Sequence, residues 1–227
     1  MWWIDSGYIM FVLPALILTF WAQFNVSSTY AKYGKIYSRR GMTAEQVARM
    51  ILDKNGLYHV QLGRVRGNLT DHFNPKTNIV NLSDTTCTST SVAAIGVAAH
   101  EVGHAIQHAT GYVPIKIRNS IVPVVNIASQ AAIPLFIIGL FFNSGLMMDI
   151  GIWFFSAAVL FQIITLPVEF NASRRAIAIL EGNYILEDEE VRGAKKVLSA
   201  AAMTYVAAAA MALAQLLRLL SMRGRRD

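Results

Sequence analysis

The sequence predicts a mainly α-helical integral membrane protein that also carries a small α+β domain. Three observations lead to this class. The chain of 227 residues is 54% hydrophobic and only 15% charged, which is more apolar than an ordinary soluble domain. The apolar residues are concentrated in long uncharged segments. The residues between those segments contain the signals of shorter helices and of a β-hairpin.

Four segments have the length and composition of membrane-spanning helices. They are residues 7–24, 120–142, 146–168 and 197–217. Only the third contains a charged residue, Asp149, and each approaches the roughly 20 apolar residues that cross a bilayer as a helix. Trp2, Trp3 and Trp21 lie at the ends of the first segment, as in an aromatic belt. This segment lacks a basic n-region and a small-residue cleavage site, so we interpret it as a retained anchor.

The positions of the basic residues predict a topology. Of the 20 Lys and Arg residues, 11 lie between residues 31 and 120 and five between 169 and 196, whereas the turn 143–145 has none. By the positive-inside rule, both charged regions are cytoplasmic, and the N-terminus and the turn are outside. The net charge of +6 then indicates a membrane-facing surface and not a nucleic-acid site.

The last segment leaves two alternatives open. Four spans would place the basic C-terminal tail outside, against the same rule. The tail contains Arg218, Arg223, Arg225 and Arg226. The alanine-rich segment before it either spans the membrane or packs against the other helices with its basic end at the cytoplasmic face.

The region between the first two spans contains signals of a helix and of strands. Residues 43–46, Thr-Ala-Glu-Gln, match a capping box, and Asn55-Gly56 marks the end of that helix. Residues 57–62 alternate weakly and predict a strand. Residues 66–73 and 78–82 flank a proline-containing turn and predict a hairpin.

The most informative motif is His100-Glu101-Val102-Gly103-His104, which matches H-E-x-x-H. Residues 91–110 around it predict a helix, with Ser91 as a candidate N-cap and Gly111 as a stop signal. Histidines four positions apart on a helix point the same way, so they can occupy two corners of a tetrahedral zinc site. Glu101 is placed to accept a proton from a water at such a site.

A catalytic zinc site needs a third protein ligand. The candidates are His59, His72, His108, Asp149, Glu169 and the acidic run 187–190. His108 lies two helical turns from His100, so one straight helix cannot bring both to one ion. Asp149 is expected near the outer face of the membrane, and an acidic run is usually a solvated surface.

Glu169 lies at the cytoplasmic end of the third predicted span. A carboxylate at a membrane boundary is costly unless it is paired or binds a cation. The second and third spans form a hairpin that returns the chain to the side of the histidine helix. Glu169 can therefore meet that helix, and the alternative is an ion pair with Arg174 or Arg175.

The stretches NPKTNIVNLS, SVAAIGVAAHEVGHAIQH and LPVEFNASRRA carry a resemblance to a known family. H-E-x-x-H followed by E-x-x-A-S after an apolar hairpin resembles membrane zinc metallopeptidases related to the M48 (HtpX/Ste24-like) group. These stretches resemble more closely the bacterial YugP-type neutral zinc metallopeptidases. The resemblance implies a zincin-like α+β domain with Glu169 as third zinc ligand. It also places Ser173 where the family pattern has an aspartate that supports a ligand.

The motif and the resemblance together predict a membrane-bound zinc metalloendopeptidase. Zn²⁺ would be held by His100, His104 and Glu169, with Glu101 as general base. Residues expected to support a ligand or stabilise the oxyanion are Ser173, Arg174, His72 and His108. The strand residues Asn78, Ile79, Val80 and Asn81 are expected to form an edge that binds an extended substrate. We expect a peptide or membrane-protein substrate, a lipid bilayer, no nucleic acid, and an active site at the cytoplasmic face of a bacterial plasma membrane.

Two alternatives remain at this point. An intramembrane zinc protease would carry H-E-x-x-H inside a span, and a non-catalytic scaffold would carry a structural zinc site, which is commonly closed and cysteine-rich. Cys87 is the only cysteine, so the chain has no cysteine-based site. The expected organisation is an anchor (1–30), a zincin-like domain (31–119), a transmembrane hairpin (120–168), a third-ligand helix with an acidic loop (169–196) and a final helix with a basic tail (197–227).

Overall fold

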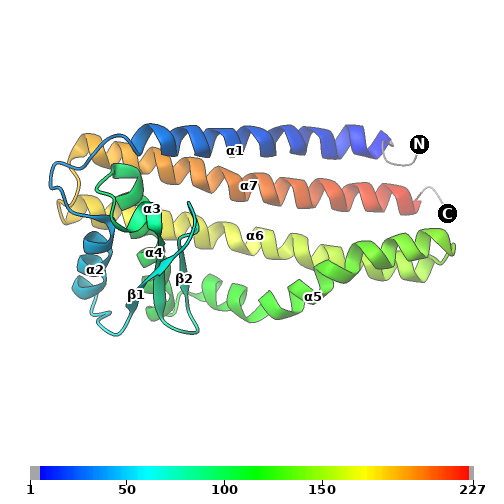
Figure 1. Cartoon of the computed structure of the whole chain (residues 1–227). Helices are drawn as coiled ribbons and strands as arrows, with labels where there is room; N and C mark the ends of the chain where they lie inside the picture. Colours follow the sequence, from blue (N-terminus) through cyan, green and yellow to red (C-terminus); the bar gives the residue numbers. More distant parts are fainter. Residues whose placement is uncertain (1–5, 225–227) are drawn as a thin grey trace. The chain divides into compact units, whose positions relative to one another are not determined.

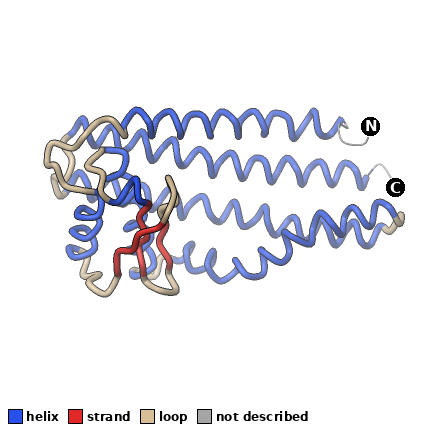
Figure 2. Tube along the Cα trace, viewed as in Figure 1, coloured by secondary structure: helices blue, strands red, loops and turns tan. Residues whose placement is uncertain are grey.

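The computed structural model describes residues 6–224 (Figure 1). These residues form two compact units. The helical unit contains the chain up to Gln23, Lys116–Pro167 and the chain from Thr204. The mixed unit contains Phe24–Ile115 and Val168–Met203. Helices account for most of both units, and one small sheet lies in the mixed unit (Figure 2). The expectations for Trp2, Trp3, Arg225 and Arg226 fall outside the described residues.

Four helical segments in the described part of the chain are long and apolar enough to cross a membrane. They are Tyr8–Tyr33, Val113–Phe141, Gly145–Gly182 and Asp188–Gly224. The first is a π-helical turn, η1 (Tyr8–Val12), followed by α1 (Leu13–Tyr33), and the others are α5, α6 and α7. The predicted class, a mainly α-helical membrane protein with a small α+β part, is confirmed.

Within the helical unit, the end of α7 lies beside the beginning of α6. The Arg223 guanidinium donates a hydrogen bond of 2.9 Å to the Asp149 carboxylate. A Cβ atom added to Gly145, in the first turn of α6, would stand 3.1 Å from Arg223. The alanine-rich segment therefore ends at the same side as the α5–α6 turn. If the α5–α6 turn is outside, as the charge pattern predicts, this arrangement favours the alternative in which the segment spans the membrane, which stays a prediction.

The mixed unit begins with α2 (Ala44–Lys54), for which the predicted capping box is present. The Thr43 hydroxyl accepts a hydrogen bond from the Gln46 backbone N–H, and the Gln46 side chain accepts one from the Thr43 N–H. The strand expected at 57–62 begins later, as β1 (Gln61–Val65). The reason is local: the Leu57 N–H bonds back to the end of α2, so residues 57–60 form a turn.

The sheet has the strand order β1-β3-β2. The predicted hairpin is present as β2 (His72–Asn74) and β3 (Ile79–Ser83), which pair antiparallel, although β2 is shorter than expected. β1 pairs with β3 in parallel on its other side. The expectation that Asn78, Ile79, Val80 and Asn81 form a substrate-binding edge is therefore wrong, because β3 is the central strand and both of its edges are already paired.

The core of the mixed unit surrounds the helix that carries H-E-x-x-H. A short helix, α3 (Asp84–Cys87), follows β3 and precedes α4 (Val92–Ala109). Most residues of α4 are buried, and its apolar side chains belong to one core cluster with those of α2 and β3. Burial on nearly all sides fixes this helix in position, as a site of defined geometry requires.

Candidate metal centre

The helix α4 forms where the sequence predicts it, because both of its ends carry strong signals. The Ser91 hydroxyl accepts a hydrogen bond of 3.2 Å from the Ala94 N–H, which satisfies one of the free N–H groups at a helix start. At the other end, Gly111 has a φ angle of 66°, a conformation that favours glycine. Between these ends, His100 and His104 lie on one face with their ring centres 4.7 Å apart.

Gly103 allows helices α4 and α6 to come into backbone contact within the mixed unit. A Cβ atom on Gly103 would stand 2.8 Å from the carbonyl oxygen of Ala172, and Ala172 is itself fully buried. Only glycine fits at such a separation without displacement. Since α6 carries Glu169 one turn before Ala172, this contact brings Glu169 within reach of the two histidines.

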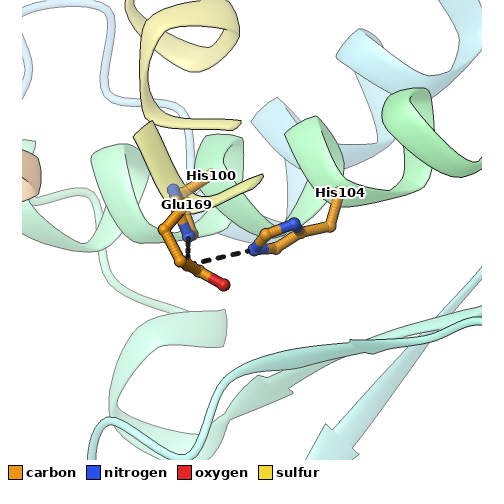
Figure 3. Close-up of side chains that lie close together, drawn as sticks. All are labelled: His100, His104 and Glu169. Carbon is orange, nitrogen blue, oxygen red and sulfur yellow. Dashed lines mark ion pairs between the residues drawn. The ribbon is translucent and has the colours of Figure 1, made fainter. Parts of the chain in front are cut away.

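The structure brings His100, His104 and Glu169 together in one cluster, in which His104 and Glu169 are buried and His100 is half-buried (Figure 3). One carboxylate oxygen of Glu169, Oε2, lies 3.3 Å from His100 Nε2 and 3.5 Å from His104 Nε2. Among residues 6–224, this is the one group of three or more metal-binding side chains whose ligand atoms lie within 4.8 Å of one another. Glu169 is 3% exposed, so its burial favours a cationic partner.

These three side chains fit a zinc ion. Tetrahedral zinc with bonds of about 2.0–2.1 Å requires its ligand atoms to stand about 3.3–3.4 Å apart, which matches the two measured separations. Two imidazole nitrogens and one carboxylate oxygen are also the ligand types of catalytic zinc sites. Three protein ligands leave the fourth coordination position open for a water or a substrate.

Glu101 lies beside the cluster and does not belong to it. Its carboxylate oxygen Oε2 accepts a hydrogen bond of 3.0 Å from the backbone N–H of Phe73, in the edge strand β2. Burial raises the pKa of Glu101 to about 7, and the negative charge of Glu169 adds to this rise whereas His100 opposes it. Within the described chain, the second oxygen of Glu101 makes no hydrogen bond and is available to a ligand.

Each histidine of the cluster has a polar partner at Nδ1, its other ring nitrogen. Ser173 Oγ lies 3.1 Å from His100 Nδ1, and Gln107 Oε1 lies 3.0 Å from His104 Nδ1. Gln107 is fully buried and is not among the site residues predicted from the sequence. The available signal was its position three residues after His104, on the same helical face.

The other residues predicted to stabilise the oxyanion or support a ligand make different contacts. His72 is bonded through its ring nitrogens to the Thr70 carbonyl and to the Asn81 side chain. His108 packs against the Phe73 ring, at 5.8 Å between ring centres. Arg174 is exposed and makes no hydrogen bond or ion pair with any described residue. We therefore find no contact between these three residues and the cluster.

Of the remaining candidates for a third ligand, His59 is exposed in the turn after α2, and the others are engaged elsewhere. Asp149 pairs with Arg223 in the helical unit. Of the acidic run, Glu187 and Glu190 bond to Arg39 and to the backbone at the beginning of α7. The ion pairs found for Glu169 among the described residues are with His100 and His104 and not with Arg174 or Arg175; the Arg175 Nε–H donates to Asn171.

Comparisons with known proteins agree with this geometry. A family model described as "Putative neutral zinc metallopeptidase" matches residues 8–224. The chain is 50% identical over 211 residues to "Putative membrane protease YugP" of Bacillus subtilis (strain 168), which covers 93% of this chain and 94% of that protein. No solved structure matches.

Proposed function

Because the chain belongs to the family of putative neutral zinc metallopeptidases, we propose that it is a membrane-bound zinc metalloendopeptidase with His100, His104 and Glu169 as zinc ligands. The observation that carries the proposal is the convergence of these three side chains. They come from two helices, with Glu169 65 positions after His104, and the separations of 3.3 and 3.5 Å between Glu169 Oε2 and the two histidines are close to those of ligands around one zinc ion. The family supports zinc as the cofactor. The membrane-protease relative and the four candidate spans support a location in the membrane.

The proposed roles of the zinc ion and of Glu101 follow from the ligand set. Zinc, when bound, supplies a Lewis acid that polarises the scissile carbonyl and lowers the pKa of a nucleophilic water. The Glu101 carboxylate accepts a proton from the attacking water as the new C–O bond forms. It then returns that proton to the leaving nitrogen as the C–N bond breaks. The Phe73 N–H, by binding one oxygen of Glu101, fixes the direction of the carboxylate.

A position of H-E-x-x-H outside the membrane spans is favoured over an intramembrane one. Helix α4, which carries H-E-x-x-H, is not among the four candidate spans in the described chain and belongs to the mixed unit. A catalytic site is favoured over a structural one because three protein ligands leave zinc an open position, and a structural site is usually closed by four.

We further propose that the site faces the cytoplasm of a bacterial cell and that its substrates are peptides or membrane proteins. The mixed unit contains most of the basic residues, which lie in the two charged regions of the sequence. By the positive-inside rule such regions are cytoplasmic. The proposed chemistry acts on the peptide bond itself, so the metal site alone does not select a particular substrate sequence.

The proposal is tested on full-length protein purified in detergent. Zinc content and cleavage of casein are measured before and after treatment with a chelator, and again after zinc is added back. We expect bound zinc, cleavage that is lost with the metal, and recovery on its return. Cleavage that persists without metal, or a protein that contains no zinc and binds none, would overturn the proposal.

A further inference from the structure

We propose that Gln107 is a positioning residue that fixes the tautomer of His104 and holds it against the turn of α6 that carries Glu169. The inference rests on the proposed zinc site, because its consequence concerns how His104 presents Nε2 to a metal. It assigns no catalytic contact to Gln107. The residue acts through His104 and through the backbone of α6.

The side-chain amide of Gln107 makes three hydrogen bonds, all of them buried or half-buried. Its Oε1 lies 3.0 Å from His104 Nδ1. Its Nε2 donates to the carbonyl oxygen of Val168 at 2.8 Å and to Asn171 Oδ1 at 3.0 Å. Val168 and Asn171 stand on either side of Glu169 on α6. One side chain of α4 therefore holds the segment of α6 that supplies the third ligand.

The partners of Gln107 determine which end of its amide faces His104. A backbone carbonyl such as that of Val168 can only accept a hydrogen bond, so the amide nitrogen must face it. The contacts of Asn171 lead independently to the same orientation of the Gln107 amide. Its Oδ1 accepts a hydrogen bond of 2.8 Å from Arg175 Nε, and arginine only donates. The same Oδ1 must then accept from Gln107 Nε2, which leaves Gln107 Oε1 for His104.

The tautomer of His104 follows from this orientation. An amide oxygen can only accept a hydrogen bond, so His104 Nδ1 must carry the proton. In a neutral imidazole the other nitrogen, Nε2, then has a free lone pair. It is Nε2 that lies 3.5 Å from Glu169 Oε2. The network of Val168, Asn171 and Arg175 thus holds a proton on Nδ1 and leaves Nε2 as the nitrogen that faces the metal site.

His100 provides an internal comparison, because its partner imposes no such choice. Ser173 Oγ, at 3.1 Å from His100 Nδ1, is a hydroxyl group that can donate or accept. It supports the ring, but both tautomers of His100 satisfy it. The two histidines of the motif therefore differ. The proton on His104 Nδ1 is fixed by the protein, whereas His100 can adopt either tautomer when a metal binds.

The direct test is ¹⁵N NMR of the histidine rings in metal-free, full-length protein, with His104 assigned from the signals missing in His104→Ala. We expect Nδ1 of His104 to be protonated in the wild type. Gln107→Met, which has a similar shape but no such bonds, should give a mixture of tautomers. Gln107→Glu keeps an acceptor for Nδ1–H and should retain the wild-type tautomer. A wild-type His104 that is unprotonated at Nδ1 would overturn the inference even if no variant folds.

Zinc affinity, measured by competition with a chelator, gives a second readout. Gln107→Met should weaken zinc binding by about 10- to 100-fold, the range typical of residues that orient a metal-binding histidine. Ser173→Ala is the matched control, because it removes the partner of His100, and it should weaken binding less. Thermal unfolding of the metal-free variants shows whether they are folded. Equal affinity in folded Gln107→Met and wild type would overturn the inference. Retention of zinc in Glu169→Ala would instead contradict the proposed ligand set.

Discussion

Gly103 and Ala172 are in backbone contact: a Cβ atom on Gly103 would stand 2.8 Å from the Ala172 carbonyl oxygen. We predict that Gly103→Ala separates α4 from α6 and pulls Glu169 away from the histidines. The substitution should lower the free energy of unfolding by about 1–3 kcal/mol, as overpacking usually does, and reduce zinc occupancy. Denaturant unfolding and zinc analysis of the purified protein measure the two effects.

Gly182→Ala is the matched control for this substitution. Gly182 also lies on α6, but a Cβ atom there would meet nothing within 4 Å. Alanine is favoured over glycine in a helix by up to about 1 kcal/mol, so this variant should be as stable as the wild type or more so. If both variants bind zinc and unfold like the wild type, the contact between α4 and α6 does not set the ligand geometry.

Glu101→Gln is expected to retain zinc and to lose hydrolysis. The amide has the same shape but cannot accept the proton of the attacking water, so the rate of casein cleavage should fall at least about 100-fold. Glu181→Gln, a change of the same kind at an exposed position, should leave the rate unchanged. A Glu101→Gln protein that binds zinc and cleaves as fast as the wild type would rule out the proposed general base.

The third ligand can be tested by comparing Glu169→Ala with His108→Ala. Glu169→Ala should lose most of its zinc, because two histidines alone form a weak site. Glu169→Gln should also bind zinc less tightly, since it lacks the negative charge. His108→Ala should keep its zinc, because the His108 ring packs on Phe73 instead. Zinc lost in His108→Ala and kept in Glu169→Ala would contradict the assignment.

The proposed topology predicts opposite labelling of two introduced cysteines in a Cys87→Ser background. Ser144→Cys, in the α5–α6 turn, should react with a membrane-impermeant thiol reagent from outside the cell. Thr77→Cys, in the exposed turn between β2 and β3, should react only after the membrane is opened. Labelling of Ser144→Cys from the cytoplasm alone would move the zinc site to the outer face.

The features that the sequence predicts correctly depend on local signals. Helix α4 is flanked by a serine N-cap and a glycine stop, and α2 begins at a capping box. The histidine pair follows from its spacing on one helix. The approach of Glu169 to the two histidines follows from the cost of a carboxylate at a membrane boundary together with the family pattern, whereas its role as a zinc ligand stays a prediction. Each of these inferences needs only a few neighbouring residues or a matching motif.

The features that sequence analysis missed depend on contacts between distant residues. The sequence predicts β3 as the outer strand of a hairpin. Its parallel pairing with β1 makes it the central strand of the sheet. In the sequence, Gln107 cannot be told from an ordinary polar residue near the end of a helix. Its role depends on Val168 and Asn171, more than 60 positions away. Local patterns in one sequence do not reveal such pairings.

The bond between Gln107 and the carbonyl of Val168 also has a consequence for how the protein can change during evolution. At position 168 the bonded atom belongs to the main chain, so any apolar side chain that fits the core preserves the contact. At position 107 the side chain must accept from a histidine and donate to a carbonyl at the same time, and glutamine alone has both groups at that length. Across natural variants, we expect substitutions to accumulate at position 168 and glutamine to persist at position 107.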